Sequence, residues 1–128
     1  MKYITVADYI VSFLESVNSK KIFLLPGGGN MYLVDAVKKN KKIQAVPMHH
    51  EQSTGIAAEA YSRISGKVGV SIVTTGPGAT NVITGVAAAW IESTPMIIIS
   101  GQVKTSDMLG AKKLRQNGVQ EVNIIPMI

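Results

Sequence analysis

The side chains most able to do chemistry stand together as His49, His50 and Glu51, within the stretch VPMHHEQSTGIAAEAYSR. Two imidazoles beside a carboxylate could form a metal site, an acid–base site, or only the polar rim of a fold. Adjacent residues of an extended segment point to opposite faces, so the two histidines cannot readily share one ion. Because the chain has no other histidine, no cysteine and no H-E-x-x-H spacing, a metal site is disfavoured.

Glu51 has two interpretations of its own. It should lie at the first turn of a helix, where the helix dipole favours a negative charge, so it could simply cap that helix. A partly buried carboxyl group at the mouth of a sheet can instead hold or share a proton near neutral pH. One carboxyl group alone does not define a reaction.

Two glycine-rich turns could cradle a phosphate, PGGG at 26–29 and GPGATN at 76–81. The third glycine of a G-x-G-x-x-G motif is absent from both, because Tyr32 and Asn81 stand there, and no G-K-[ST] occurs. A nucleotide-binding α/β domain therefore stays an open alternative with little support. A second alternative is that the glycines only form a tight turn, which lets a strand and a helix pack closely.

The elements that must position these residues alternate along the chain. Short apolar strands are predicted at 21–25, 43–46, 68–73 and 95–100, separated by helix-type spacing at 6–17, 31–39, 52–64 and 79–92. This alternation predicts an α/β fold of three layers, α/β/α, with a mainly parallel, flavodoxin-like doubly wound sheet. Since ligands gather at the carboxyl ends of such strands, the segments PGGG, MHHE, TTGPG and SGQ should converge on one edge.

Local patterns add detail to these elements. Thr5 and Asp8 resemble a capping box for the first helix, and Asn30 is placed to cap the second. The strands at 68–73 and 95–100 are apolar enough to be buried on both faces. The residues spaced like one buried face of the first helix are Val6, Ile10, Phe13, Leu14 and Val17.

Length and composition indicate one globular domain over residues 1–128, without repeat, linker or low-complexity segment. The absence of cysteine excludes disulfides and thiolate zinc sites and suits a cytoplasmic protein. The N-terminal stretch MKYITVADYI does not read as a signal peptide. No apolar run approaches the ~20 residues of a membrane span.

The net charge of +5 raises the question of whether the chain binds nucleic acid. The lysines stand in short groups near expected element ends, only two arginines are present, and aromatic residues do not interleave with the lysines. We therefore expect no nucleic-acid or membrane partner and interpret the lysines as a solvated basic rim, with an anionic partner surface as the alternative.

Five segments, in this order, resemble the N-terminal, pyrimidine-binding domain of thiamine-diphosphate-dependent enzymes, specifically the acetolactate synthase-like group. They are LPGGG (25–29), HHEQSTGIAAEAYSR (49–63), TTGPGATNVITGVAAAW (74–90), PMIIISGQV (95–103) and VQE (119–121). Each segment alone is modest, but together they cover almost the whole chain.

The resemblance implies a role for Glu51. It matches the glutamate that hydrogen-bonds a ring nitrogen of the cofactor's aminopyrimidine, and proton sharing there activates the cofactor for attack on a carbonyl. The two histidines then become rim residues, with His50 rather than His49 expected to face the site.

The resemblance also implies further site residues. Pro77 and Asn81 match residues placed against the pyrimidine ring. Leu25, Gly27 and Gly28 match the active-site loop after the first strand. Gln120 matches a glutamine near the reacting substrate and is, with Glu51, a candidate catalytic residue.

Three departures from the acetolactate synthase pattern stand near the expected site. Leu25 replaces a tyrosine, Val119 replaces a phenylalanine, and the segment 104–118 is longer than its counterpart. They indicate a side branch of the group, a carboligase or decarboxylase acting on 2-oxo acids such as pyruvate. Relatives associated with bacterial surface-sugar synthesis, which transfer a pyruvate-derived acetyl unit to another carbonyl, belong to such a branch.

Members of the group are longer than this chain. They bind the diphosphate and Mg2+ through a G-D-G…N motif in a C-terminal domain, and this sequence contains no G-D-G. The resemblance therefore implies half of an active site, completed by the diphosphate-binding domain of a second subunit, and an isolated domain that is inactive. Whether FAD is bound stays open, since the FAD site of some relatives lies in a middle domain.

Exposed half-site surfaces predict self-association, as a homodimer through the helices that flank Glu51 and Asn81. The alternative function is a stand-alone flavodoxin-like binding module with a degenerate cofactor pocket.

Overall fold

A parallel sheet of four strands, in the order β2-β1-β3-β4, organises the computed structural model, which describes residues 3–128. Met1 and Lys2, which begin the N-terminal stretch quoted above, lie outside the described residues. The strands are β1 (Lys21–Leu24), β2 (Gln44–Pro47), β3 (Gly69–Val73) and β4 (Met96–Ser100). This order, with its reversal between β1 and β3, is the doubly wound, flavodoxin-like arrangement, so the predicted parallel sheet is confirmed.

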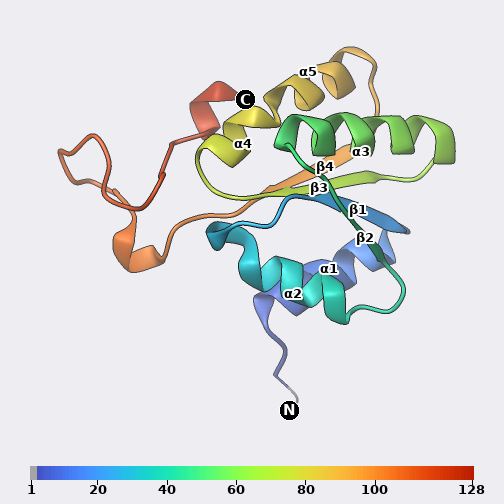
Figure 1. The fold of residues 1–128 in the computed structure, drawn as a ribbon, viewed down its shortest axis with the longest axis horizontal. Helices are drawn as coiled ribbons and strands as arrows, with labels where there is room; N and C mark the ends of the chain where they lie inside the picture. Colours follow the sequence, from blue (N-terminus) through green and yellow to red (C-terminus); the bar gives the residue numbers. More distant parts are fainter. Residues whose placement is uncertain (1–2) are drawn as a thin grey trace.

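Helices cover both faces of the sheet and complete the three predicted layers (Figure 1). One face carries α1 and α2, and the other carries α3, α4 and α5. The α-helices are α1 (Val6–Ser16), α2 (Met31–Lys39), α3 (Glu51–Ser65), α4 (Pro77–Asn81) and α5 (Ile83–Ile91); the 3-10 turns are η1 (Gly28–Asn30), η2 (Thr105–Asp107) and η3 (Ile125–Met127).

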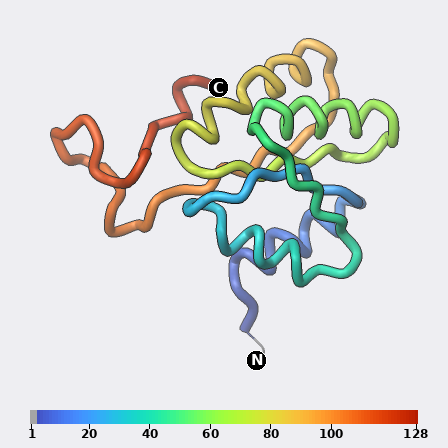
Figure 2. The backbone as a smooth tube through the Cα atoms, in the orientation of Figure 1, coloured from blue at the N-terminus to red at the C-terminus, as the bar shows by residue number. Residues whose placement is uncertain are grey.

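The core lies against β3, whose five residues are all buried, as predicted for a central parallel strand. A smaller cluster of Val73, Ala79 and Val82 lies on the α4 side, and Ile124 packs against it. The chain after β4 therefore loops away from the sheet and returns to α4 (Figure 2). The main cluster, on the α1–α2 side, comprises Val11, Leu14, Ile22, Leu24, Ala36, Val37, Ile43, Val70 and Ile72.

The predicted buried face of α1 is only partly correct. Val11 and Leu14 are buried, but Val6 is 76 % exposed and Phe13 is 48 % exposed. The buried stripe of α1 instead runs through Val11 and Leu14, with Ala7 and Ile10 packed against the core. At the start of this helix, Thr5 Oγ1 accepts the Asp8 N–H at 3.0 Å, which confirms the predicted cap.

Two further expectations about elements are wrong in detail. The helix predicted over 79–92 is two helices, because the regular pattern breaks at Val82 between α4 and α5. The strand β4 is half-buried rather than buried on both faces, since it is the edge strand of the described sheet.

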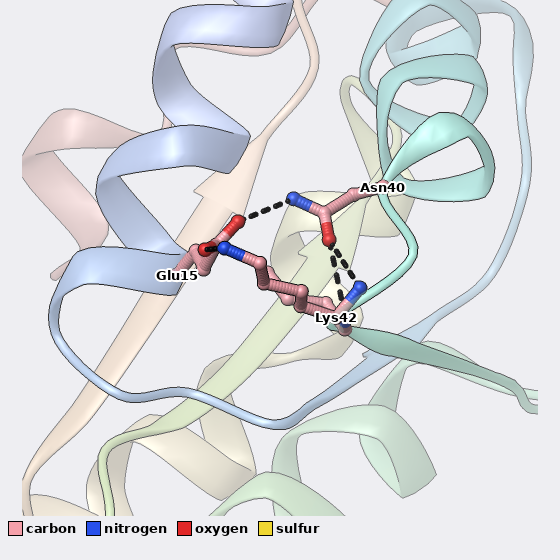
Figure 3. A network of polar contacts seen from close by, with 4 residues as sticks. Glu15, Asn40 and Lys42 are labelled. Carbon is pink, nitrogen blue, oxygen red and sulfur yellow. Dashed lines mark hydrogen bonds and ion pairs between the residues drawn. The ribbon is translucent and has the colours of Figure 1, made fainter.

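A polar network ties α1 to the turn that leads into β2 (Figure 3). Asn40 Nδ2 and Lys42 Nζ donate to the two carboxylate oxygens of Glu15, at 3.0 and 2.6 Å. The hydrogen bond from Lys42, followed by that from Asn40, lowers the pKa of Glu15, and the bond to Glu15 raises the pKa of Lys42. The network lies on the α1–α2 side, on the opposite face of the sheet from α3 and α4.

None of the helices within residues 3–128 is long and apolar enough to cross a membrane.

Candidate functional site

The predicted convergence at the carboxyl edge of the sheet is confirmed. The loops after β1 and β3 meet there, at the reversal of strand order where ligands of doubly wound sheets bind. The first residue of α3, Glu51, reaches the same edge from the segment that follows β2.

The Glu51 carboxylate points into the protein. The residue is 9 % exposed, and its Oε2 accepts a hydrogen bond from Asn81 Nδ2 at 3.0 Å. Its Oε1 faces Gly78, where an added Cβ would lie 3.3 Å away. We call Glu51, Gly78 and Asn81 the Glu51 corner. The start of the 15-residue helix α3 favours a negative charge at this position.

Buried hydroxyl groups anchor this corner to the centre of the sheet. Thr54 Oγ1 donates to the Glu51 carbonyl at 2.7 Å and lies 2.6 Å from Ser71 Oγ in β3. Because the Thr54 proton is committed to the carbonyl, Ser71 is the donor in the second bond. Both residues are fully buried, so the backbone of Glu51 is held by contacts that exclude water.

The neighbouring histidines stay at the rim. His50 is the N-cap of α3, and its Nδ1 accepts the Gln52 N–H at 3.2 Å. Both His49 and His50 are exposed. Within residues 3–128, no group of three or more His, Cys, Asp or Glu side chains is placed to hold a metal ion.

Two side chains fix the loop after β1: Asn30, at the end of that loop, and Thr74, which follows β3. Asn30 Oδ1 accepts the Gly27 N–H at 2.8 Å, and its Nδ2 donates to the Leu25 carbonyl at 3.0 Å. Asn30 is the N-cap residue of α2, but its side chain makes no capping bond, so that expectation is wrong. Thr74 Oγ1 accepts the Gly29 N–H at 3.1 Å and presses against Gly27, where a Cβ would lie 2.6 Å from it.

A cavity of about 560 Å³ borders Thr74. Gly28 borders it without neighbours that a Cβ would meet, and Val119 and Gln120 form part of its wall. We call it the Gln120 cavity. It is lined by Gly28, Gly29, Met31, Tyr32, Thr74, Thr75, Gln102, Val103, Lys104, Thr105, Asp107, Val119 and Gln120.

The structure brings several of the predicted site residues together in two neighbouring sets. Glu51 and Asn81 share one corner, while Gly28 and Gln120 share the cavity. Thr74 touches both sets, since it lines the cavity and its Cγ2 lies 2.7 Å from a Cβ built at Gly78. Of the remaining candidates, Leu25 is half-buried beneath the loop, Gly27 packs on Thr74, and Pro77 is the exposed first residue of α4.

The last segment of the chain reaches the site through Gly76. This glycine has φ +61°, and an added Cβ would overlap the carbonyl oxygen of Gln120, which itself has φ +54°. The close contact puts Gln120 directly against the turn that leads to Asn81. Only a residue without a side chain permits both this conformation and this approach.

Glu121 holds that segment in place. Its carboxylate accepts the N–H groups of Leu109, at 2.8 and 3.0 Å, and of Gly118, at 3.0 Å. These backbone hydrogen bonds, Leu109 first, lower the pKa of Glu121 because they favour its charged form.

Sequence reasoning did not single out Thr54, Thr74, Gly78 or Glu121. A signal existed for Thr74, which is one of two hydroxyl residues directly after a buried strand and before a glycine turn. Thr54 stands one helical turn after Glu51, a spacing that brings side chain and carbonyl together. For Glu121, no local pattern indicates that Leu109, 12 residues away, is a partner.

Comparison with known proteins adds a family. The sequence model of the family described as thiamine pyrophosphate enzyme, N-terminal TPP binding domain, matches residues 4–127. The chain is 43 % identical over 106 residues to the acetolactate synthase large subunit of Buchnera aphidicola subsp. Acyrthosiphon pisum, covering 83 % of this chain and 19 % of that protein.

Two further relatives are also acetolactate synthases. The acetolactate synthase large subunit of Corynebacterium glutamicum is 38 % identical over 120 residues, 94 % of this chain and 19 % of the relative. The chloroplastic acetolactate synthase of Arabidopsis thaliana is 40 % identical over 116 residues, 91 % of this chain and 17 % of the relative. The chain spans about a fifth of the length of the curated relatives it matches.

Proposed function

Because this chain belongs to the thiamine pyrophosphate enzymes, as their N-terminal TPP-binding domain, we propose that Glu51 holds the aminopyrimidine ring of thiamine diphosphate. The observation that carries the proposal is the inward-facing Glu51 carboxylate, with one oxygen bonded to Asn81 and the other facing Gly78. The family match favours this function over the stand-alone binding module.

The residues of the corner fit such a ring. A carboxylate that keeps one oxygen free of protein donors can accept from, or share a proton with, a protonated ring nitrogen. Gly78 leaves the space in front of Oε1 without a side chain, and Asn81 holds the other oxygen in position. Pro77, on the exposed side of the same turn, and His50, at the rim, would border the ring.

When bound, thiamine diphosphate supplies a nucleophilic carbon and an electron sink for breaking and forming bonds next to a carbonyl. Glu51 would contribute by holding a proton between Oε1 and the ring nitrogen. The hydroxyl pair of Thr54 and Ser71 keeps its backbone fixed while it does so. Gln120, in the adjacent cavity, would orient the reacting substrate.

For the whole protein we propose an acetolactate synthase-like carboligase or decarboxylase that acts on 2-oxo acids such as pyruvate, in the cytoplasm. Mg2+ and the diphosphate would be held by the diphosphate-binding domain of a second subunit, so the isolated chain should not turn over pyruvate. FAD has no proposed ligand among the residues of this chain.

A homodimer is proposed through the helices around the corner. Exposed apolar side chains on this layer support it, since Ile56 and Ile64 of α3 and Trp90 and Ile91 of α5 are 47 to 88 % exposed. Sedimentation velocity over a range of concentrations should show a concentration-dependent dimer; a monomer throughout would remove the proposal.

Replacing Glu51 by Gln in the full-length protein tests the function. Replacing the ionisable carboxylate by an amide should lower the rate of pyruvate turnover by roughly 10²–10⁴-fold, the usual contribution of general acid–base catalysis. Glu92→Gln is the matched control, because Glu92 is an exposed glutamate that pairs with Arg63. Both variants should keep the circular dichroism spectrum of the wild-type protein, which shows that they fold. A Glu51→Gln enzyme within a few-fold of wild type would end the proposal.

A further inference from the structure

The side chain of Thr74 occupies space that glycines of both turns leave open. A Cβ added at Gly27 would lie 2.6 Å from the Cβ and Oγ1 of Thr74, and one added at Gly78 would lie 2.7 Å from its Cγ2. Both distances are overlaps, because carbon atoms pack best at about 3.5–4.0 Å. A Cβ added at Gly29 would lie 3.2 Å from Thr74 Oγ1. The two glycine turns therefore make room for one threonine side chain.

The two branches of this side chain contact different segments of the protein. Thr74 Oγ1 accepts the Gly29 N–H at 3.1 Å and so holds the loop after β1. The Cγ2 methyl group packs on Gly78, the second residue of α4. Thr74 itself is held at the end of the buried strand β3, where its carbonyl accepts the Ser100 hydroxyl at 3.3 Å. One short side chain therefore connects the loop after β1 with the start of α4.

The contact with Gly78 brings Thr74 to the Glu51 corner. Gly78 is buried, and the Cβ that would overlap the Thr74 methyl group would also lie 3.3 Å from Glu51 Oε1. The same point in space is thus bordered by the methyl group and by the carboxylate oxygen. The methyl group therefore limits the space in front of Oε1, although Thr74 makes no hydrogen bond to Glu51 among the contacts of residues 3–128.

We propose that Thr74 is a positioning residue for the cofactor ring. Its methyl group limits the space in front of Glu51 Oε1, and its hydroxyl group holds the loop after β1. The inference rests on the proposed function, which places the ring at Oε1. A threonine holds both groups in one orientation, because branching at Cβ restricts its χ1 angle. Since Thr74 does not touch the shared proton, it sets how tightly the cofactor is held and leaves the proton to Glu51.

Two substitutions in the full-length protein separate the two branches. Thr74→Ser removes only the methyl group, so KM for thiamine diphosphate should rise about fourfold while kcat changes less than about twofold. Thr74→Val removes only the acceptor, so amide hydrogen exchange of the segment containing Gly29 should become roughly 2–10-fold faster. Thr84→Val makes the same change at an exposed threonine of α5 and should do neither. A Thr74→Ser enzyme with the wild-type KM overturns the proposal.

A rescue experiment tests the contact itself. Gly78→Ala should speed amide exchange of residues 74–81 by about tenfold or more, because the new methyl group overlaps Thr74 Cγ2. Adding Thr74→Ser removes the overlapping atom and should restore slow exchange. KM for thiamine diphosphate should stay raised, since the new methyl group still lies 3.3 Å from Glu51 Oε1. Gly27→Ala is the matched control, because its methyl group overlaps atoms that serine retains. Rescue of both glycine variants, or of neither, overturns the proposal.

The failure of this proposal can be told from the failure of the proposed function. If Glu51→Gln lowers turnover as expected but Thr74→Ser leaves KM for thiamine diphosphate unchanged, the positioning role alone is wrong. If Glu51→Gln keeps the turnover of the wild-type protein, the proposed function fails and the role of Thr74 toward the cofactor fails with it. The rescue of Gly78→Ala is measured by amide exchange without cofactor, so it tests the contact in either case.

Discussion

The Glu51 corner and the loop that carries Gln120 are neighbours built in opposite ways. Glu51 begins a 15-residue helix, is buried, and is anchored to the central strand by the Thr54–Ser71 hydroxyl pair. Gln120 follows an exposed, irregular loop whose position depends on the Glu121 carboxylate and on a backbone contact with Gly76. The group proposed to hold a proton at a fixed point is thus placed on a regular element. The group proposed to orient the substrate lies on a loop, the kind of segment that tolerates change.

The two regions touch at Gly76, so Gly76→Ala should have the largest effect on their relationship. The added Cβ would overlap the Gln120 carbonyl oxygen and strain a left-handed backbone, which alone costs on the order of 1–3 kcal/mol. We expect a lower midpoint of urea unfolding and displaced amide signals for Gln120 and Glu121.

Gly110→Ala provides the control for that experiment. Gly110 has a similar φ of +54°, but an added Cβ would meet no atom within 4 Å. It therefore carries the backbone strain without the contact. Equal loss of stability in the two variants would contradict a packing role for the Gly76–Gln120 contact.

Thr54→Val should weaken the corner while leaving the loop intact. The substitution removes the donor to the Glu51 carbonyl and leaves the buried Ser71 hydroxyl without its partner, at a cost of about 1–3 kcal/mol. Thr54→Ser retains the hydroxyl and should recover most of the stability. Denaturant unfolding measures both, and a Thr54→Val protein as stable as wild type would show that the hydroxyl pair does not anchor Glu51.

The smallest effect is expected from pH, and of these two regions we expect it in the loop. Hydrogen bonds lower the pKa of Glu121 in the folded chain below its ordinary value of 4.5. Its contribution is therefore complete above pH 4.5 and is lost as pH falls through the lower, folded-state value. On acidification, the amide signals of Leu109 and Gly118 should move before those of α3.

Glu121→Gln should abolish that pH dependence, because the amide does not titrate, and should leave the same signals shifted already at neutral pH. If the signals of α3 and of the loop respond together in the wild-type chain, the two regions are not independent.

Much of this fold could be predicted from the sequence. The alternation of apolar runs with helical spacing was enough for the parallel sheet and its layers, and the turns after the strands indicated the functional edge. The family motifs then pointed to Glu51, whose place at the start of α3 depends on neighbours a few residues away.

Tertiary structure alone decided which surfaces meet. It exposed Val6 and Phe13 on α1, broke the helix at Val82, and gave Asn30 to the loop after β1 instead of to α2. It also set Gly29 against Thr74, 45 residues away, and Gln120 against Gly76. Periodicity and turn chemistry act between near neighbours along the chain, whereas these contacts arise only when distant segments compete for the same space at the edge of the sheet.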